Sequence, residues 1–446
     1  MFDWDRGQLA DSIAALDAGV SVNADDRPHG AGEIGVLKTS AVSGGRFYPE
    51  QNKTVVEHER RLVAEPVQAD SILVSRMNTP ALVGDSCYVP DSQPNLFLPD
   101  RLWQLKPKDR SSINMRWLSF VLQSAAYRRY VEVHATGTSG SMKNLPQSKL
   151  LALPVNYPAP REQAKIAQVL DTLDTVIQET EAIIAKLRAV KQGLLHDLLT
   201  RGIDASGELR PPQPEAPHLY KPSPLGWVPE EWECCQAASV LISIDAGKSP
   251  DCQDIPAASD QWGVLKVGAV HPDGLRLEEN KVVEVEGLKN PAYLIRRGDL
   301  LLSRANTFEL VGLVCHVTSD PKNLMLSDKT LRLTVRDSRM TTRFLFWQLQ
   351  HPRSRTQIEN AATGTSGSMK NISQSSVEKM WIVRPSLDEQ KEISRRLDAI
   401  ACRYEVEMNG CSKLRKLKSG LMDDLLTGHV RVTPLLAEGE QQEGGI

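Results

Sequence analysis

The stretch ATGTSGSMKN at residues 135–144 occurs a second time, letter for letter, at residues 362–371. Downstream the similarity continues at the same offset of 227 residues, so that GLLHDLLT at 193–200 matches GLMDDLLT at 420–427. Upstream the offset becomes 228, which implies a single-residue insertion or deletion. Two copies of about 200 residues each are domain-sized and too long for solenoid repeats. The chain is therefore one unit written twice, with a built-in pseudo-dyad.

Composition is that of an ordinary globular protein, because 41% of the 446 residues are apolar and 24% are charged. No stretch approaches eighteen uncharged apolar residues, and the acidic start MFDWDRGQ does not resemble a signal peptide. We therefore expect no membrane segment and a cytoplasmic location. The seven cysteines include no CxxC pair, so we expect reduced thiols and no metal site.

The net charge of −3 does not by itself indicate a nucleic-acid partner. Arginines are nevertheless concentrated in one part of the second copy: Arg296, Arg297, Arg304, Arg332, Arg336, Arg339, Arg343, Arg353 and Arg355. The simplest interpretation of this cluster is a solvated surface.

The part of each copy that precedes the repeated stretch predicts a mixed α+β domain. The apolar run SILVS at 71–75 predicts a buried strand that delivers the polar loop RMNTP at 76–80. LWQL at 102–105 predicts another strand, and residues 114–130 show helical spacing that closes on Arg128 and Arg129. The repeated stretch itself is rich in Gly, Ser and Thr, which is typical of a loop or tight turn. Its role is either to contact a partner or to hold the domain against the next helix.

Two long amphipathic helices are predicted, at residues 158–200 and 385–428. In the first, apolar residues step by threes and fours: Ile166, Val169, Leu170, Leu173, Val176, Ile177, Ile183, Ile184, Leu187, Val190, Leu194, Leu195 and Leu198. Such a helix is about 50–60 Å long at about 1.5 Å per residue, so its apolar face requires a partner helix. The second helix supplies that face in antiparallel orientation, because a dyad reverses direction. Arg403, Glu407, Asn409 and Gly410 interrupt its apolar stripe, so we expect a bend or a looser middle.

The remaining segments complete the predicted domain organisation. Residues 1–157 and 230–384 form two similar globular domains, and the proline-rich residues 201–229 form an extended linker. Residues 429–446 read as a flexible tail, since its end is rich in Gly, Gln and Glu.

Catalytic motifs are scarce. The sequence NPAY at Asn290–Tyr293 resembles the base-flipping motif of amino-methyltransferases, but Ala292 replaces its second proline and the first copy has no equivalent. No Walker-type phosphate loop, zinc-protease motif or nucleophile elbow is present. We therefore predict no catalytic residues, and a methyltransferase that acts through this motif is the alternative.

The order of the segments resembles the specificity subunit of type I restriction-modification systems. The resemblance rests on Glu162-Gln163 and Glu389-Gln390 at the helix starts, on GWVPEEW at 226–232, which opens the second copy, and on SRANT at 303–307. Only FDWD at 2–5 corresponds to GWVPEEW in the first copy. The resemblance implies two target recognition domains, separated by an antiparallel coiled coil, that read an asymmetric bipartite site on double-stranded DNA. It also implies two adenine-N6 methyltransferase subunits and up to two restriction and translocase subunits, which would bind AdoMet, Mg and ATP.

Polar residues shared by both copies are the predicted DNA-backbone contacts, because phosphate contacts carry no sequence information and can be alike in both halves. They are Lys38, Ser75, Arg76, Asn78, Thr79 and Lys143 in the first copy, and Lys266, Ser303, Arg304, Asn306, Thr307 and Lys370 in the second. For Arg76 and Arg304 the alternative role is a structural salt bridge at a strand end. Residues that read bases should lie in loops that differ between the copies.

Helix residues are the predicted contacts to partner subunits: Leu187, Val190, Leu194, Leu414, Leu417 and Leu421. A coiled-coil scaffold without DNA contact is a second alternative to the recognition function.

Overall fold

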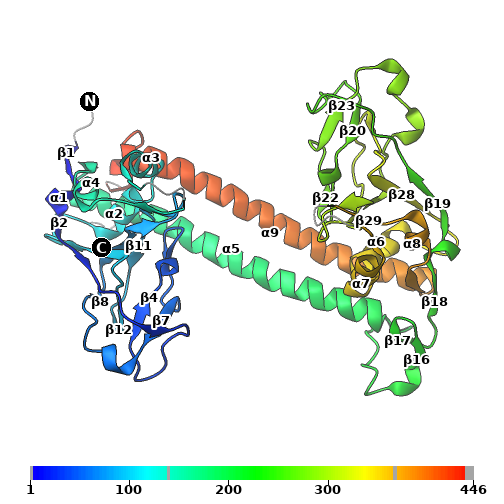
Figure 1. Cartoon of the computed structure of the whole chain (residues 1–446), viewed down its shortest axis with the longest axis horizontal. Coiled ribbons are helices and arrows are strands. Elements are labelled where there is room, and N and C mark those ends of the chain that lie inside the picture. Colours follow the sequence, from blue (N-terminus) through cyan, green and yellow to red (C-terminus); the bar gives the residue numbers. More distant parts are fainter. Residues whose placement is uncertain (1–3, 138–140, 365–368, 437–446) are drawn as a thin grey trace, which may run out of the picture. The chain divides into compact units, whose positions relative to one another are not determined.

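The computed structural model describes residues 4–137, 141–364 and 369–436. The chain divides into two compact units: unit 1 comprises residues 1–181 and 409–446, and unit 2 comprises residues 182–408 (Figure 1). Helices α5 (Pro160–Thr200) and α9 (Leu387–Thr427) each begin in one unit and end in the other. The prediction of a mixed α/β fold with an internal repeat is confirmed.

Unit 1 contains two sheets. The first is antiparallel with the order β11–β9–β13–β2, and the second has the order β3–β7–β4–β12–β8, in which β4 and β12 are parallel. Their strands are β2 (Ile13–Ala18), β3 (Ala24–Asp25), β4 (Gly35–Leu37), β7 (Asn52–Val55), β8 (Pro66–Val67), β9 (Ser71–Ser75), β11 (Ser86–Val89), β12 (Gln93–Phe97) and β13 (Leu102–Pro107). Strand β9 is buried throughout, as its apolar run predicts.

Unit 2 repeats this topology with the sheets β19–β28–β24–β26 and β23–β20–β27. Their strands are β19 (Leu241–Ala246), β20 (Gly263–Leu265), β23 (Asn280–Val282), β24 (Leu300–Ser303), β26 (Val314–His316), β27 (Leu324–Met325) and β28 (Thr330–Val335). The strand β20 again runs parallel to β27. Gly19 and Gly247 occupy equivalent turns, where a Cβ atom would lie 1.6 Å from the carbonyl oxygen of Leu98 or 1.8 Å from that of Leu326.

Short strand pairs and helices complete the units. The pairs in unit 1 are β1 (Asp5–Gln8) with β15 (Pro154–Tyr157), β5 (Val42–Ser43) with β6 (Arg46–Phe47), and β10 (Met77–Asn78) with β14 (Lys143–Asn144). Those in unit 2 are β16 (Tyr220–Ser223) with β17 (Gly226–Pro229), β18 (Glu233–Gln236) with β30 (Trp381–Arg384), β21 (Val270–His271) with β22 (Gly274–Leu275), and β25 (Ala305–Asn306) with β29 (Lys370–Asn371). The helices are α1 (Leu9–Ser12), α2 (Met115–Val121), α3 (Ala125–His134), α4 (Gln147–Leu151), α6 (Thr342–Gln350), α7 (Pro352–Ala361) and α8 (Gln374–Glu378).

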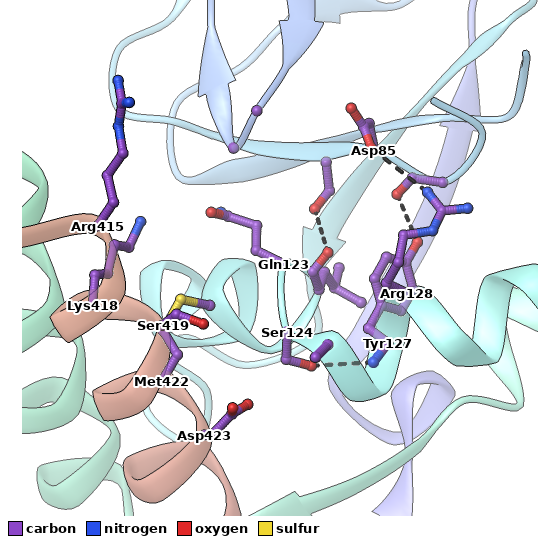
Figure 2. Close-up of a pocket in the computed structure, with 16 residues that line it drawn as sticks. Asp85, Gln123, Ser124, Tyr127, Arg128, Arg415, Lys418, Ser419, Met422 and Asp423 are labelled. Atoms are coloured by element: carbon purple, nitrogen blue, oxygen red, sulfur yellow. Dashed lines mark hydrogen bonds and ion pairs between the residues drawn. The ribbon is translucent and has the colours of Figure 1, made fainter. Parts of the chain in front are cut away.

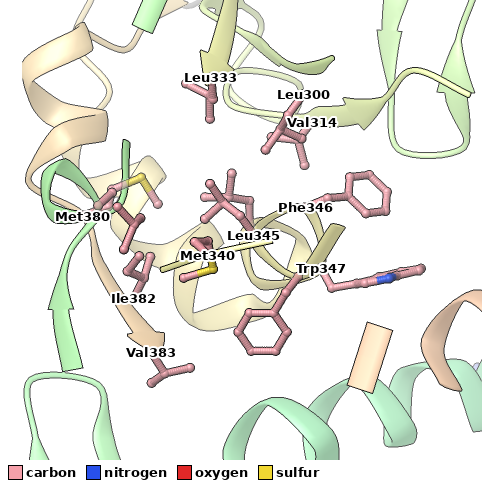
Figure 3. Packing of buried hydrophobic residues seen from close by; sticks show 14 of the residues in the cluster. Leu300, Val314, Leu333, Met340, Leu345, Phe346, Trp347, Met380, Ile382 and Val383 are labelled. Atoms are coloured by element: carbon pink, nitrogen blue, oxygen red, sulfur yellow. The ribbon is translucent and has the colours of Figure 1, made fainter. Parts of the chain in front are cut away.

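Each unit has a core built from its sheet, its helices and one segment of each long helix. In unit 2, Phe346 and Trp347 of α6 lie in the core cluster shown in Figure 3. Leu198 near the end of α5 and Leu397 near the start of α9 belong to the same cluster. In unit 1, Leu170 near the start of α5 shares a cluster with Leu425 near the end of α9. The two helices therefore pack antiparallel within each unit, as predicted.

The single helix predicted at residues 114–130 is wrong. It consists of α2 and α3, because the Ser124 side chain accepts a hydrogen bond from the backbone N–H of Tyr127 and starts a new helix. Arg128 and Arg129 consequently lie near the start of α3 and do not close a helix. The sequence signal was the N-cap serine within an otherwise continuous apolar pattern.

The segments after the long helices are more ordered than predicted. Within the predicted linker, Tyr220 and Val228 are buried and belong to the hairpin β16–β17, and Arg210 is also buried. Within the predicted tail, Val432 is 2% exposed and joins the unit 1 core, while residues 437–446 lie outside the described residues. Helix α9 is continuous through the interrupted stripe, where Val406 and Met408 are exposed.

Candidate nucleic-acid interface

The repeated stretch folds back onto the strand that follows β9 or β24. In unit 1, β14 pairs with β10 so that Lys143 faces Asn78, and a bridge between Thr136 and Asn144 closes the loop. In unit 2, Lys370 faces Asn306 in the same way. Residues 138–140 and 365–368 of the stretch lie outside the described residues. The structure thus joins two segments that the sequence singled out separately.

The lysines of the stretch are held by backbone contacts. Lys143 Nζ donates to the carbonyl oxygen of Gly137 at 3.0 Å, and Lys370 Nζ donates to that of Gly364 at 2.7 Å. Gly137 and Gly364 have φ angles of +145° and +144°, a backbone conformation that residues with a side chain rarely adopt. Neither lysine has an ion-pair partner among residues 4–137, 141–364 and 369–436. Their charges are thus positioned and uncompensated.

Arg76 and Arg304 contact neutral groups. Arg76 Nε donates to Asn144 Oδ1 at 3.3 Å, and its guanidinium carbon lies 5.5 Å from the centre of the Trp103 ring. Arg304 Nη1 donates to the backbone oxygen of Asp328 at 3.4 Å. Within the described part of the chain neither arginine pairs with a carboxylate, so the alternative of a structural salt bridge is wrong. The Arg76 guanidinium therefore contacts the repeated stretch through Asn144, and the Arg304 guanidinium contacts the backbone at Asp328.

The neighbouring serines and asparagines hold the loop. Ser75 is fully buried and accepts a hydrogen bond from Asn78 Nδ2 at 3.2 Å, while Asn78 Oδ1 accepts from the backbone N–H of Thr79 at 2.8 Å. The same bonds, at 3.4 and 2.9 Å, link Ser303, Asn306 and Thr307. The serine hydroxyls therefore point into the turn, and a direct contact between these hydroxyls and phosphate does not fit their burial.

Lys38 and Lys266 carry counter-charges. Lys38 Nζ lies 2.8 Å from Asp26 Oδ1, and Lys266 Nζ lies 2.5 Å from Asp254 Oδ1. The hydrogen bond from Lys38 holds the pKa of Asp26 below its usual range, and Lys266 does the same for Asp254. Asn306 Nδ2 donates to the carbonyl oxygen of Val267 at 3.3 Å, which brings the Lys266 segment to the β25–β29 pair. Within the described residues, no corresponding hydrogen bond joins the Lys38 segment to β10.

Sequence reasoning missed a basic pair beside the arginines. The backbone N–H of Arg76 donates to the carbonyl oxygen of Arg101, and that of Arg304 donates to the carbonyl oxygen of Lys329. Arg101 is exposed, and it forms no ion pair within the described ranges. Arg101 and Lys329 are separated by the same offset of 228 residues as the other pairs, so the repeat could have revealed them.

Sequence reasoning also missed a second pair, Arg128 and Arg355. They anchor the loop after Thr79 in unit 1 and the loop after Thr307 in unit 2. Arg128 Nη1 donates to the carbonyl oxygen of Val83 at 2.8 Å. Tyr127, which lies beside Arg128 in Figure 2, donates from Oη to the carbonyl oxygen of Gly84 at 2.9 Å. In unit 2 the equivalent Arg355 donates to the carbonyl oxygens of Val311 and Phe308. The offset of 227 residues between the two arginines was again the available signal.

The motif Glu-Gln at the helix starts is structural. Glu162 accepts hydrogen bonds from Trp4 Nε1 at 3.3 Å and from Arg431 Nε at 2.6 Å. Glu389 accepts from Trp232 Nε1 at 3.0 Å and from Arg210 Nη1 at 2.6 Å. In each unit the arginine comes from the segment that follows the other long helix. These contacts, called the Trp–Glu–Arg clamps below, close each unit.

The glutamine of the motif joins the long helix to the globular part. Gln163 accepts a hydrogen bond from the backbone N–H of Asn114 at 2.8 Å and donates to the carbonyl oxygen of Ser112. Gln390 makes the matching bonds with Thr341 and Arg339. Strand β1 pairs with β15 as β18 pairs with β30, so the opening strand of unit 1 is present despite its short sequence remnant.

The arginine cluster of the second copy does not form one free cationic surface. Arg332, Arg343 and Arg355 each pair with a carboxylate. Arg296 and Arg336 are exposed, in agreement with a solvated surface.

Asn290 and Tyr293 do not form a base-flipping site. Asn290 Oδ1 caps the short turn η7 (Pro291–Tyr293) by accepting the backbone N–H of Ala292 at 3.0 Å, and Tyr293 packs against apolar core residues. Among the described residues, no group of three or more His, Cys, Asp or Glu side chains could hold a metal ion. In the same ranges, no helix has the length and apolarity needed to cross a membrane.

The predicted partner-binding residues fall into two classes. Leu187 is 8% exposed, and Leu194 and Leu421 pack against the cores of their units. Leu414 is half-buried. In contrast, Val190 is 47% exposed and Leu417 is 51% exposed. These two residues occupy equivalent positions of the repeat, which places one exposed apolar side chain on a long helix of each unit.

Comparison with known proteins identifies relatives along the whole chain. Residues 3–189 match the family described as the type I restriction modification DNA specificity domain. The specificity subunit of the type I restriction enzyme EcoEI from Escherichia coli is 25% identical over 345 residues, which cover 62% of this chain and 58% of that subunit. A putative MjaX specificity subunit from Methanocaldococcus jannaschii is 22% identical over 441 residues, which cover 96% of this chain and 94% of that protein.

A solved structure has the same fold. The crystal structure of the type I restriction-modification S subunit from M. genitalium matches with a TM-score of 0.61 and 12% identity, and the match covers 95% of this chain and 96% of that chain. The family match lies in the first copy, and the second copy repeats its strand order, its clamp and its paired loops. The first copy therefore matches the type I restriction modification DNA specificity domain, and the chain as a whole is similar to type I specificity subunits.

Proposed function

We propose that the chain is the DNA-reading subunit of an adenine-N6 methyltransferase complex, in which each unit recognises one half of an asymmetric bipartite site. The observation that carries this proposal is the matched cationic site of each unit. In unit 1, Lys143 lies in one strand pair, Arg76 directly precedes that pair, and the carbonyl oxygen of Arg101 accepts the backbone N–H of Arg76. Lys370, Arg304 and Lys329 hold the same positions in unit 2, where Lys329 also pairs with Asp328 at 3.4 Å. Two sites with the same arrangement of residues can make the same contact at two places along the DNA backbone.

Charge supports the assignment to nucleic acid. Arg76, Lys143 and Arg304 are held by neutral acceptors, so their charges are available to phosphate oxygens. The frames are alike, whereas the surrounding loops differ in sequence, which is the pattern expected when phosphate contacts position a protein and other residues read bases. Lys38 and Lys266 would join these contacts by exchanging Asp26 or Asp254 for phosphate.

The long helices support the assignment of two methyltransferase partners. Val190 and Leu417 are equivalent, exposed and apolar, so one partner type can bind twice by the same contact. The chain would contribute recognition only, while AdoMet, Mg and ATP would be bound by methyltransferase and restriction subunits. An assembly that acts on genomic DNA would work in the cytoplasm.

Binding measurements at several salt concentrations test this function. The chain, purified with its methyltransferase subunits, should bind mixed-sequence duplex DNA with an affinity that falls steeply as salt rises, because several phosphates are neutralised. A scaffold without DNA contact would show no binding to duplex DNA at any salt concentration. That result would overturn the proposal, while methyl transfer by the isolated chain would overturn the recognition-only role.

A further inference from the structure

The loop between the strand pair and Gly84 or Gly312 is built on one frame in both units. We call these segments loop 79–84 and loop 307–312. The backbone N–H of Val83 donates to the carbonyl oxygen of Thr79 at 2.9 Å, and that of Val311 donates to the carbonyl oxygen of Thr307 at 2.9 Å. The two loops therefore fold as the same turn.

The ends of the two loops are fixed by matched contacts. Gly84 and Gly312 have φ values of +81° and +76°, and a Cβ atom would lie 2.8 Å from Val131 or 2.4 Å from Ile358. Arg128 and Arg355 hold the loop carbonyls from the adjacent helix. A loop anchored at both ends presents its tip in a defined direction.

The tips differ although the frames agree. Loop 79–84 carries Pro80 and Ala81, and loop 307–312 carries Phe308 and Glu309 at the equivalent positions. All four are exposed, and Phe308 remains 42% exposed although it is aromatic. An exposed aromatic side chain next to a carboxylate has no role in the core of unit 2.

The tip of loop 307–312 adjoins the cationic site. Phe308 follows Asn306 by two residues, and Asn306 pairs with Lys370 across β25 and β29. Arg304 precedes Asn306 by two residues on the same segment. Phe308 and Glu309 therefore follow, by two and three residues, the strand position that pairs with Lys370.

A carboxylate in this position is selective. Hydrogen bonds from its own backbone N–H and from the Thr307 hydroxyl hold the pKa of Glu309 below its usual range, so it is ionised and only accepts hydrogen bonds. Phosphates repel it on any sequence. A base that offers an amino group, as cytosine does through N4 in the major groove, attracts it.

We infer that Phe308 and Glu309 read bases in the half-site of unit 2, with Glu309 accepting a hydrogen bond from a cytosine amino group and Phe308 packing against an adjacent base or thymine methyl group. Pro80 and Ala81 offer only apolar contact, so loop 79–84 reads its half-site differently. This inference rests on the proposed function and names its specificity determinants.

The test uses the wild-type complex with methyltransferase subunits and its Glu309→Ala variant, with a library of duplexes varied one base pair at a time. Glu309→Ala should lower discrimination at one C·G pair by about tenfold or more. It should also raise affinity for random duplex by about two- to threefold, because a repulsive charge is removed. Glu286→Ala, which removes an exposed carboxylate outside the loop, is the matched control and should alter neither quantity.

Replacing the tip of loop 307–312 with that of loop 79–84 provides a second readout. Phe308→Pro combined with Glu309→Ala should change the preference in one half-site only and leave the other half-site intact. Unchanged preference at every position, with wild-type binding intact, would overturn the inference. Absence of specific binding by the wild-type complex would instead overturn the proposed function, so the two failures are distinguishable.

Discussion

The two Trp–Glu–Arg clamps contain the same three side chains but differ in burial. In unit 2 the side chains of Arg210 and Glu389 are 8% and 10% exposed. In unit 1 Glu162 is 3% exposed, but its partner Arg431 is 34% exposed. Removal of Glu389 would leave the buried Arg210 with only the exposed carboxylate of Glu231, 2.9 Å away, as its counter-charge, whereas Arg431 is partly exposed to water. The same motif therefore contributes unequally to the two units.

The two units also differ in the residue that caps the N-terminus of one equivalent helix. Ser124 starts α3 in unit 1, and the equivalent His351 starts α7 in unit 2, where its Nδ1 accepts the backbone N–H of Arg353 at 3.1 Å. Burial, together with Arg353 and His196, lowers the pKa of His351 to about 4. Only one unit thus has a titratable cap at this position. The repeat conserves hydrogen-bonding geometry at this position, although the residues differ chemically.

The largest difference is expected on removing the clamp carboxylates. Glu389→Ala should lower the free energy of unfolding by about 3–5 kcal/mol, because Arg210 stays buried and keeps only the exposed Glu231 as a partner. Glu162→Ala should cost about 1–3 kcal/mol, since the charged hydrogen bonds are lost but Arg431 reaches solvent. Urea unfolding measures both, with the exposed Asp388→Ala as a control near zero. Equal losses for the two variants would contradict the comparison.

The next-largest difference in stability between the two units is expected at acid pH. Unfolded His351 binds a proton near its ordinary pKa of about 6.5, while the folded residue resists protonation until about pH 4. Stability of unit 2 should therefore fall as pH drops through this window, by about 3 kcal/mol. His351→Ser, which installs the residue used by unit 1, should remove that component in urea unfolding at pH 6.5 and pH 4. An unchanged pH dependence in the variant would show that His351 is not its source.

The two predicted partner-binding surfaces, at Val190 and at Leu417, should contribute equally to binding, unlike the two clamps, which contribute unequally to stability. Val190→Glu and Leu417→Glu should each weaken one methyltransferase contact by about 2 kcal/mol or more, the effect of a central interface residue. Native mass spectrometry should show one bound subunit for each single variant and none for the double variant. Gln192→Glu and Ser419→Glu lie two residues further on and face another side of their helices, so both subunits should remain bound. Retention of two subunits by Val190→Glu would exclude this surface.

The smallest expected effect concerns the matched arginines. Arg76→Ala and Arg304→Ala should each reduce the slope of log affinity against log salt by about one, and lower affinity on all sequences alike. The exposed Arg296→Ala serves as a control. Relaxed preference at a single base pair would mean that the arginine reads a base.

Much of the fold was predictable because the repeat gives two versions of most elements. The pairing of the long helices follows from their apolar spacing, their antiparallel direction follows from the dyad of the repeat, and β9 follows from its apolar run. The ordered structure of the linker was not predictable, because it depends on the contact between Arg210 and Glu389, which are 179 residues apart in the sequence. Proline content indicated only an extended chain.

The candidate site was predictable in position and less so in detail. Identity between copies singled out Arg76 and Arg304, and the structure places their segments beside the repeated stretch through the β10–β14 and β25–β29 pairs. It also selected Ser75 and Ser303, because a shared turn preserves residues as strictly as a shared ligand does. Burial separates these two causes, and burial is not visible in a pair of matching letters.

The central claim is that two alike frames with different loops read two different half-sites. Genome-wide mapping of N6-methyladenine, in cells with and without this chain beside its methyltransferase subunits, tests it most directly. The account predicts methylation that depends on the chain and marks one asymmetric motif, in which two short sequences are separated by bases that are not read. A continuous or palindromic motif, or methylation that is unchanged without the chain, would contradict it.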